Sequence, residues 1–436
     1  MLRKRMIQIT ENNKKNASII TLGCKVNQYE SEVIKEKLEN QGYIFTDSQS
    51  GFDLCIINTC AVTGESSRKS CQMIRRAVKL NPTAVIAVTG CQSQLNAGMI
   101  AAIDGVDVVC GNYNKLSLLD HIAAKSETPL ILAETLRPDD NFEPMAIDKF
   151  GRTRAYIKIQ DGCNSNCAYC IIPKIRGNIR MKPADDVIRE AHHLARNGCK
   201  EIVLIGIETS SYKNLTGLVG ELQTIHGLER IRLGSLDPSF MRPNVTDELL
   251  ANSKFMPHFH LSMQSGSDNV LKSMRRKYNT EIALRNIEYI KSVNSDVNFT
   301  TDIMVGYPNE SESDFADTVT FAETVKFLHI HIFTYSQRPG TDAAAMSGQI
   351  PEQEKIRRAA ILSDTQSDIK RGVYERYIGK PTQILVETYN NQLACGHTPN
   401  FLEAEIISQV DIKDKFITII PTRINDAGNK LIGEII

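Results

Sequence analysis

The sequence predicts an α/β fold in three parts, and three observations support that prediction. Short Val- and Ile-rich runs alternate with helical patterns in the first 130 residues. A second strand–helix series begins near residue 155, and the chain after residue 380 reads as short strands between Asn, Gly and Asp turns. We therefore expect an N-terminal doubly wound α/β domain at 15–130, a central partial (β/α)6 barrel at 150–378 and a small antiparallel β-barrel at 380–436.

Continuous apolar runs predict the fold of the first part. These runs, at 17–22, 52–58, 84–89 and 106–110, do not alternate with polar residues, which suits parallel strands buried on both faces. Helical patterns at 29–42 and 65–80 separate them, and such alternation with short connections is typical of a doubly wound sheet. The segment 126–153, rich in Pro, Asp and Glu, is expected to be a linker.

The second part repeats strand and helix over roughly 200 residues, too few for a complete eight-fold barrel. The expected strands are 155–159, 201–205, 230–233, 258–262, 297–304 and 329–335. The expected helices lie near 184–197, 217–226, 244–252, 280–293 and 311–326, with further helical patterns between 352 and 378. An open, partial barrel follows.

Charge and cysteine content narrow the class of protein. Lys+Arg and Asp+Glu are 51 each, so bulk charge neither indicates nor excludes a nucleic-acid partner. The N-terminal segment lacks a signal peptide's apolar core and no run approaches 18 apolar residues, so we expect a soluble cytoplasmic protein. Its 11 cysteines then suit metal ligands better than disulfides. Five of them are expected to be core or incidental residues: Cys55, Cys71, Cys110, Cys199 and Cys395.

The first candidate metal site is a C-x3-C-x2-C run, Cys163, Cys167 and Cys170, directly after the first strand of the second series. Three thiolates on one loop can hold three corners of a [4Fe–4S] cube and leave the fourth iron open for a small molecule. A zinc site is the alternative, but zinc normally takes four ligands in paired groups, and no partner pair lies nearby in the sequence.

The second candidate site has three cysteines far apart in the sequence. Cys24, Cys60 and Cys91 each follow a strand of the first part. Carboxyl ends of parallel strands gather at one edge of an open α/β sheet, so we expect these thiols to converge. Cys110 ends the fourth strand and remains a competitor for a place in this set.

The motifs around both sets resemble a known family. LGCKVNQYES, NTCAVT, GCQSQ, DGCNSNCAYC, HLSMQSGSDNVLKSMRRKY, TTDIMVGYPNESESDF and FTYSQRPGTDAAAM together look like the methylthiotransferase family, over essentially the whole chain. Residues 150–340 resemble the radical S-adenosylmethionine (SAM) superfamily, and 380–436 would be the family's RNA-binding TRAM barrel. The residues 22–27, LGCKVN, are similar to the branch that acts on N6-threonylcarbamoyladenosine beside the anticodon.

This resemblance implies two [4Fe–4S] clusters and SAM as cofactors. Cys163, Cys167 and Cys170 would hold the cluster that cleaves SAM to a 5′-deoxyadenosyl radical, and Cys24, Cys60 and Cys91 an auxiliary cluster that carries the sulfur. One SAM would methylate that sulfur, and the radical would remove hydrogen from C2 of the adenosine. Partners would be the tRNA anticodon stem-loop and an external electron donor. Isopentenyladenosine in tRNA or a ribosomal-protein Asp are the alternative substrates, and an iron–sulfur RNA-binding or electron-transfer protein is the non-enzymatic one.

The remaining site residues are candidates for SAM and RNA contacts. Ser235, Gln264 and Gly306, at the ends of later strands, are the candidates for SAM, and no side-chain general base is apparent. Two basic runs suit phosphates, and the alternative for each is a solvated helix or loop face. They are Lys174, Arg176, Arg180 and Lys182 beside the cysteine loop, and Arg68, Lys69, Arg75, Arg76 and Lys79 in the first part. Residues 371–436 carry seven Lys/Arg against eight Asp/Glu, so RNA binding there would need stacking groups such as Phe401 or Tyr389, if exposed.

Overall fold

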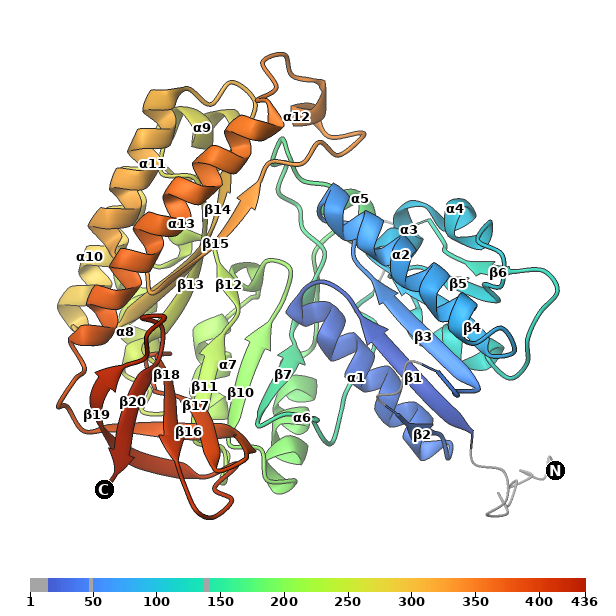
Figure 1. Cartoon of the computed structure of the whole chain (residues 1–436), viewed down its shortest axis with the longest axis horizontal. Coiled ribbons are helices and arrows are strands. Elements are labelled where there is room, and N and C mark those ends of the chain that lie inside the picture. The colour runs from blue at the N-terminus through green and yellow to red at the C-terminus, as the bar shows by residue number, and fades with distance from the viewer. Residues whose placement is uncertain (1–14, 47–49, 136–140) are drawn as a thin grey trace. The chain divides into compact units, whose positions relative to one another are not determined.

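The computed structural model describes residues 15–46, 50–135 and 141–436 (Figure 1). They form two compact units. Unit 1 holds the chain up to Ile147 together with Ile171–Asn178, and unit 2 holds Asp148–Cys170 together with Ile179–Ile436. The division into three domains remains a prediction, and the N-terminal segment in which we expect no signal peptide lies largely outside the described residues. No helix in the described ranges is both long and apolar enough to cross a membrane.

The sheet of unit 1 has six parallel strands in the order β2-β1-β3-β4-β5-β6. They are β1 (Asn16–Thr21), β2 (Ile44–Phe45), β3 (Leu54–Thr59), β4 (Val85–Gly90), β5 (Val108–Cys110) and β6 (Leu130–Leu132). Every residue of β3 and β4 is buried, as continuous apolar runs predict for central strands.

Helices cover both faces of this sheet, which confirms the doubly wound prediction. On one face α1 (Lys25–Asn40) and η2 (Lys115–His121) pack through Ile34, Leu38 and Leu118. On the other, α2 (Gly64–Leu80) and α4 (Ala97–Ala101) pack through Ile74 and Ile100. The chain passes from β1 to β2 on one side of β1 and then from β2 to β3 on its other side, so the order reverses between β1 and β3. Such a switch point is where open α/β sheets bind ligands.

Two segments of unit 1 were not anticipated. Residues 126–153, expected to be a linker, contribute β6, which pairs with β5 at the edge of the sheet. The short helix α5 (Ile172–Arg176) follows the cysteine loop in the sequence, yet it belongs to unit 1. There Ile171 and Ile175 form a small apolar cluster with Ala61 and Cys91.

Unit 2 is built around a parallel wall of strands in two sheets, β11-β10-β7 and β12-β13-β14-β15. The strands are β7 (Arg154–Lys158), β10 (Glu201–Ile205), β11 (Arg230–Leu233), β12 (Ser235–Leu236), β13 (His258–Gln264), β14 (Asn298–Val305) and β15 (His329–Thr334). A bridge between Ile231 and Phe255 joins the sheets. All six predicted strands are present, so the open, partial barrel is confirmed.

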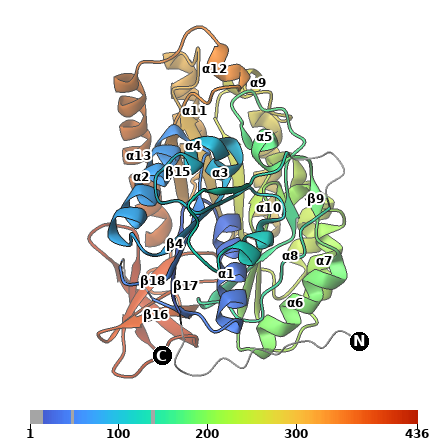
Figure 2. The same cartoon turned by 90° about the vertical axis from the view of Figure 1, so that its right-hand side faces the viewer.

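The helices of this wall also follow the predicted order. They are α6 (Ala184–Arg196), α7 (Leu215–Leu222), α8 (Pro243–Leu250), α9 (Asp268–Ser273), α10 (Thr280–Val293), α11 (Glu312–Val325) and α13 (Glu352–Glu375). Figure 2 shows α6, α7 and α8 in a row along the outer side of the wall. Strands and helices therefore alternate as in the first part. The polar side chains described next lie on one face of the parallel strands.

The polar face of the wall encloses the ring of Phe401. Ring contacts place His258 of β13 stacked on Phe401 at 4.3 Å, with the guanidinium groups of Arg154 and Arg232 at 5.2 and 5.1 Å. Arg154 and His258 are the first residues of β7 and β13, so Phe401 lies near the amino-terminal ends of these two strands. Glu201 balances the arginines: its Oε1 lies 2.7 Å from Nε of Arg232.

The C-terminal residues form a closed barrel in the order β16-β17-β18-β20-β19. The strands are β16 (Thr382–Asn390), β17 (Leu393–His397), β18 (Glu403–Ile407), β19 (Phe416–Ile424) and β20 (Leu431–Ile435). The predicted β-barrel is confirmed, although β18 and β20 pair in parallel. Its core includes Val373 and Tyr374 of α13, so the barrel shares a core with the rest of unit 2.

The two aromatic residues expected to stack on RNA are engaged within the unit. Phe401 lies between the rings of His258 and His397. Tyr389 packs on the core of the barrel, and its hydroxyl donates to the carbonyl oxygen of Ser408 at 3.1 Å. Neither ring serves as an open stacking platform in this structure, because packing against the rest of the unit gives each of them a partner.

Replacing Glu201 by Gln should strongly destabilise unit 2. Burial lowers the pKa of Arg230 to about 10, even with Glu201 3.8 Å away. Without the carboxylate, buried guanidinium groups lose their counter-charge, and we expect the free energy of unfolding to fall by about 3–5 kcal/mol. Urea denaturation followed by circular dichroism measures this. The exposed pair of Asp186 and Arg189 supplies the control, since Asp186→Asn should cost less than about 1 kcal/mol. Equal losses in both variants would contradict the role of Glu201.

Candidate metal centres

Three cysteines follow neighbouring strands at the carboxyl edge of the sheet of unit 1. Cys24 is the N-cap of α1 after β1, Cys60 directly follows β3, and Cys91 begins α3 (Cys91–Leu95) directly after β4. Cys24 and Cys60 therefore flank the switch point between β1 and β3. Helix amino termini favour negative charge, which suits a thiolate at the start of α1.

Electrostatic coupling shows that these thiols lie near one another. Exclusion of water raises the pKa of Cys24 and of Cys60, and Cys91 raises both further. Cys24 is exposed, whereas Cys60 and Cys91 are buried. Arg176 acts in the opposite direction and lowers the pKa of both thiols. The predicted convergence of the three cysteines is thus present in unit 1, with a guanidinium in range.

The glycines before Cys24 and Cys91 allow this close approach. Gly23 has φ +99°, and a Cβ there would lie 2.9 Å from Sγ of Cys60. Gly90 has φ +98°, and its Cβ would lie 2.5 Å from both Oδ1 of Asn58 and the carbonyl oxygen of Thr59. A side chain at either position would be strained by its backbone and would push the cysteine loops apart.

A buried polar network fixes the loops that carry Cys24 and Cys60. The Nδ2 of Asn27 donates to the carbonyl oxygens of Leu22 and Thr59, at 2.8 and 2.9 Å. Asn58 donates in turn to the carbonyl oxygen of Asn27 at 2.9 Å and to Oγ of Ser31 at 3.0 Å. One helix, α1, therefore fixes the residues that precede Cys24 and Cys60.

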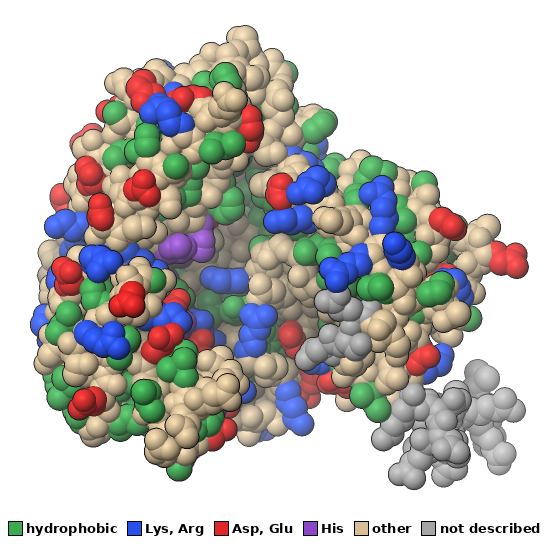
Figure 3. Space-filling model, in the orientation of Figure 1, with side chains coloured by type: hydrophobic (Ala, Val, Ile, Leu, Met, Phe, Trp, Pro, Cys, Tyr) green, Lys and Arg blue, Asp and Glu red, His purple; other side chains and the backbone are tan. Residues whose placement is uncertain are grey.

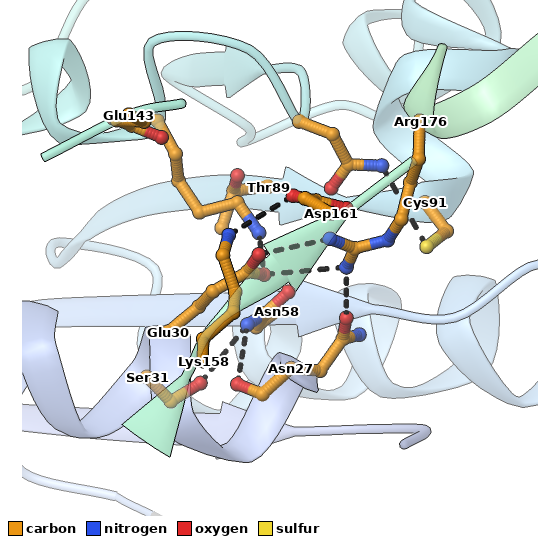
Figure 4. A network of polar contacts seen from close by, with 12 residues as sticks. Asn27, Glu30, Ser31, Asn58, Thr89, Cys91, Glu143, Lys158, Asp161 and Arg176 are labelled. Atoms are coloured by element: carbon orange, nitrogen blue, oxygen red, sulfur yellow. Dashed lines mark hydrogen bonds and ion pairs between the residues drawn. The ribbon is translucent and has the colours of Figure 1, made fainter. Parts of the chain in front are cut away.

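Charged groups complete this network (Figure 4). Arg176 of α5 places Nη1 2.9 Å from Oε1 of Glu30 and Nη2 2.7 Å from Oδ1 of Asn27. Lys115 binds the other oxygen of Glu30. All three charged side chains are fully buried or nearly so. The carboxylate of Glu30 thus binds a cation through each of its oxygens.

Cys60 and Cys91 have further polar neighbours. The backbone N–H of Cys60 donates to Oγ of Ser70 at 3.1 Å, and that hydroxyl donates to the carbonyl oxygen of Cys60 at 2.9 Å. The Nδ2 of Asn112 donates to Sγ of Cys91 at 3.6 Å and to the carbonyl oxygen of Ile175 at 3.3 Å. These bonds position the two loops and tie α5 to them.

Cys110, the competitor, points elsewhere. It lies in the apolar core beneath α1, with its Sγ 3.9 Å from the carbonyl oxygen of Lys115. Burial raises its pKa to about 11, and burial likewise raises that of Cys55, in the other core, to about 12. Both have the surroundings of packed residues and not those of metal ligands.

The loop with the C-x3-C-x2-C run lies in unit 2, after β8 (Gln160–Asp161). Cys163 Sγ contacts Oε2 of Glu208 at 3.1 Å and receives the backbone N–H of Ser165 at 3.3 Å. Burial raises the pKa of Cys163 to about 12, and the Glu208 carboxylate adds to the rise. Gln160 connects the loop to the segment after β10, because its Oε1 accepts the N–H of Glu208 at 2.9 Å.

Arg276 organises the other side of this loop. Its Nη1 donates to Sγ of Cys167 at 3.4 Å, and its Nη2 lies 3.1 Å from Oδ2 of Asp237. The guanidinium lies 5.0 Å from the ring centre of Tyr278. Tyr169 is close as well: burial raises its pKa, Arg276 lowers it, and Cys167 and Cys170 raise it. The prediction missed Glu208, Asp237 and Arg276, although Arg276 lies in the quoted motif HLSMQSGSDNVLKSMRRKY.

The three residues proposed for SAM lie after or at the end of a strand, Ser235 two residues after β11. Ser235 starts β12, Gln264 ends β13 and Gly306 follows β14. Gln264 has φ +66°, a left-handed conformation in which only a few per cent of non-glycine residues occur and which clusters at functional sites. Gly306 donates its N–H to Oε2 of Glu310 at 2.6 Å. Their contact with SAM remains a prediction.

The basic run beside the cysteine loop differs from the prediction. Arg176, Arg180 and Lys182 are buried, and each pairs with a carboxylate: Glu30, Asp161 and Glu190 respectively. Only Lys174 of the run is exposed, so the run is not a phosphate-binding surface. The other run does face solvent on α2, where Arg68 and Lys69 pair with Glu65, and Figure 3 shows Lys and Arg on this face of unit 1.

The donor chemistry of both thiol sets suits iron–sulfur clusters better than zinc. Three thiolates around one zinc ion lie about 3.8 Å apart at the usual zinc–sulfur distance. Among the residues that the structure describes, neither set brings three ligand atoms within 4.8 Å of one another. Three thiolates can instead hold three corners of a cube, and each set has a polar donor and a guanidinium nearby for its negative charge.

Comparisons with known proteins agree with this organisation. The sequence matches the radical SAM superfamily over residues 157–322 and the uncharacterized protein family UPF0004 over residues 16–111. It is 37% identical over 414 residues to threonylcarbamoyladenosine tRNA methylthiotransferase MtaB of Bacillus subtilis, covering 92% of each chain. It is 32% identical to a tRNA-2-methylthio-N(6)-dimethylallyladenosine synthase of Acetivibrio thermocellus, covering 90% of this chain and 85% of that one.

One solved structure supports the fold. The radical S-adenosylmethionine methyltransferase TsrM from Kitasatospora setae, with cobalamin and a [4Fe–4S] cluster bound, superposes with a TM-score of 0.56 at 14% identity. The match covers 76% of this chain and 77% of that one. At this identity the likeness concerns the fold.

Replacing Gly90 by Ala should disrupt the cysteine loops. The new Cβ would meet Thr59 and Asn58 at 2.5 Å in addition to the cost of a left-handed backbone. Gly51→Ala is the control, since Gly51 has φ +82° and no atom within 4 Å of the added Cβ. We expect Gly51→Ala to lower the free energy of unfolding by about 1–2 kcal/mol and Gly90→Ala by clearly more, with less iron bound after reconstitution. Urea unfolding and iron analysis measure both. Equal effects of the two substitutions would show that the close packing at Gly90 is unimportant.

Proposed function

The chain belongs to the radical SAM methylthiotransferase family, and we propose that it places a methylthio group on C2 of N6-threonylcarbamoyladenosine in tRNA. A relative 37% identical over nearly the whole chain carries that substrate in its name. The observation on which the proposal depends is the presence of two separate thiol sets, one at the switch point of unit 1 and one on the loop of unit 2. A methyltransferase or a radical enzyme alone needs no second set.

We infer that Cys163, Cys167 and Cys170 hold one [4Fe–4S] cluster and Cys24, Cys60 and Cys91 hold another. When bound, the first would supply a radical from SAM and the second a sulfur atom. The chain's own groups prepare the first site: Arg276 directs a positive charge at Cys167, and Asp237 fixes that guanidinium. Ser235, Gln264 and Gly306 would contact SAM at the same edge of the wall.

The polar and charged groups near Cys24, Cys60 and Cys91 have a different role. The buried guanidinium of Arg176 lowers the pKa of Cys24 and of Cys60, so it favours anionic sulfur at these positions. Asn112 donates to Sγ of Cys91 and keeps that ligand oriented. None of these groups is placed to accept a proton from substrate, and we assign no general base.

For tRNA, we propose that the exposed cations of α2 contact phosphates. Arg75, Arg76 and Lys79 are exposed on a helix that buries Ile74 and Ala77 in the sheet. The C-terminal barrel would act as the RNA-binding module, using surfaces other than Phe401 and Tyr389. An external electron donor would supply the reducing electron.

Cysteine substitutions test the two clusters. Anaerobically reconstituted protein should bind about eight iron atoms. Replacing Cys163, Cys167 and Cys170 by Ala should leave about four and abolish cleavage of SAM to 5′-deoxyadenosine. Replacing Cys24, Cys60 and Cys91 should also leave about four, but the reduced protein should still cleave SAM and form no methylthio product. Cys110→Ala is the control and should keep about eight, because its sulfur lies in the core. Methylthio product from the Cys24/Cys60/Cys91 variant would disprove the assigned sulfur site.

Nucleoside analysis tests the substrate. In a strain lacking the gene, mass spectrometry of digested tRNA should show loss of 2-methylthio-N6-threonylcarbamoyladenosine and accumulation of its unmethylthiolated precursor. The gene on a plasmid should restore the product, whereas the Cys24/Cys60/Cys91 variant should not. Loss of the methylthio derivative of isopentenyladenosine instead would assign the chain to the other tRNA branch, and intact tRNA with an unmodified ribosomal protein would assign it to the protein substrate.

A further inference from the structure

A second kind of ligand cluster lies on the polar face of the wall in unit 2. His260 of β13, Asp302 of β14 and His331 of β15 each offer one ligand atom, and all these atoms lie within 4.8 Å of one another. Figure 3 shows histidine side chains gathered in one patch over these strands. The cluster lies farther along the strands than the Phe401 contacts and includes no cysteine, so it is separate from the thiol set of unit 2.

Strand register brings the three residues together. His260 pairs with Thr300, Thr300 with His329, and Asp302 with His331. Side chains two residues apart share a face of a strand, so His260, Asp302 and His331 project from the same face of three adjacent strands. β15 is the edge strand of its sheet, and His331 is exposed there, which gives an ion access from solvent.

Hydrogen bonds orient His260 as a ligand. Its Nδ1 lies 2.9 Å from Oγ1 of Thr300, a hydroxyl that Nε2 of His258 approaches at 3.0 Å. The other nitrogen, Nε2, is thereby directed at Asp302, with 3.2 Å between Nε2 and Oδ2. Metal-bound histidines are held in this way, one ring nitrogen on a second group and the other on the ion.

The distances suit one small ion. Two ligand atoms bound to the same tetrahedral ion at 2.0–2.1 Å lie about 3.3 Å apart, close to the separation of His260 and Asp302. The ligand atom of the third residue, the exposed His331, lies within 4.8 Å of the other two.

We propose that His260, Asp302 and His331 form a binding site for a divalent transition-metal ion, distinct from the iron of the clusters. Two imidazoles and one carboxylate suit Mn²⁺, Fe²⁺ or Zn²⁺ better than Mg²⁺ or Ca²⁺, which prefer oxygen ligands alone. Three protein ligands leave coordination positions open toward the polar face, where water or an anionic oxygen ligand would bind. The simpler alternative is an ion pair of His260 and Asp302 without a metal.

Titration of the cluster-loaded, oxidised protein with MnCl2 distinguishes these readings. Oxidised [4Fe–4S] clusters give no electron paramagnetic resonance signal, so the signal of free Mn²⁺ reports binding directly. We expect about one Mn²⁺ per chain, displaced by ZnCl2. Asp302→Asn and His331→Asn should each weaken binding at least tenfold while iron content stays unchanged. His331→Asn alters an exposed residue, so it keeps the test valid if Asp302→Asn impairs folding.

His226→Asn is the matched control, because it removes an exposed imidazole far from the cluster in the sequence and should leave Mn²⁺ binding unchanged. Absence of bound Mn²⁺ in the wild-type protein, together with absence of Zn²⁺ binding by calorimetry, would overturn the proposal in favour of the ion pair. Binding that persists at full affinity in both Asp302→Asn and His331→Asn would overturn it as well, since the ion would then have other ligands. None of these measurements depends on methylthiolation.

Discussion

The buried carboxylate of Glu30 constrains much of unit 1. A charge removed from water costs several kcal/mol unless partners replace its hydration, and here Arg176 and Lys115 do so. One turn before Glu30, Asn27 binds the same guanidinium and also holds the carbonyl oxygens of Leu22 and Thr59. The groups that neutralise Glu30 therefore also fix the loops of Cys24 and Cys60. Stability and ligand geometry depend on the same atoms.

Unit 2 also contains buried charges, and they are paired at both ends of its parallel strands. At the amino end of the strands, Glu201 and the ring of Phe401 accommodate three arginines. At the carboxyl end, Arg276 and Asp237 face the cysteine loop. All these groups lie on one face of the strands, because every second side chain of a strand points to the same side. The His260 cluster occupies the interval between the two ends.

The sequence predicted the functional residues that directly follow strands. It did not predict contacts between residues that are far apart in the chain. Cys24, Cys60 and Cys91 could be predicted to converge because parallel strands end at one edge. Arg176, Arg180 and Lys182 read as a solvated basic run, since no acidic residue interrupts them, yet their partners come from other elements up to 146 residues away. Phe401 was expected to stack on RNA because its partners in the fold, His258 and His397, cannot be recognised from the sequence. The His260 cluster needs the register of three strands, which alternation alone does not provide.

The position of α5 also affects how the chain folds during synthesis. Lys115 leaves the ribosome 85 residues after Glu30, and Arg176 follows Glu30 by 146 residues. At about 5–20 residues per second, the second delay is roughly 7–30 s. During that time the nascent sheet has Glu30 with one of its two cations, and Cys91 lacks the apolar cover of Ile171 and Ile175. Unit 1 thus reaches its final packing only after the cysteine loop of unit 2 has been translated, which makes its maturation a late event in synthesis.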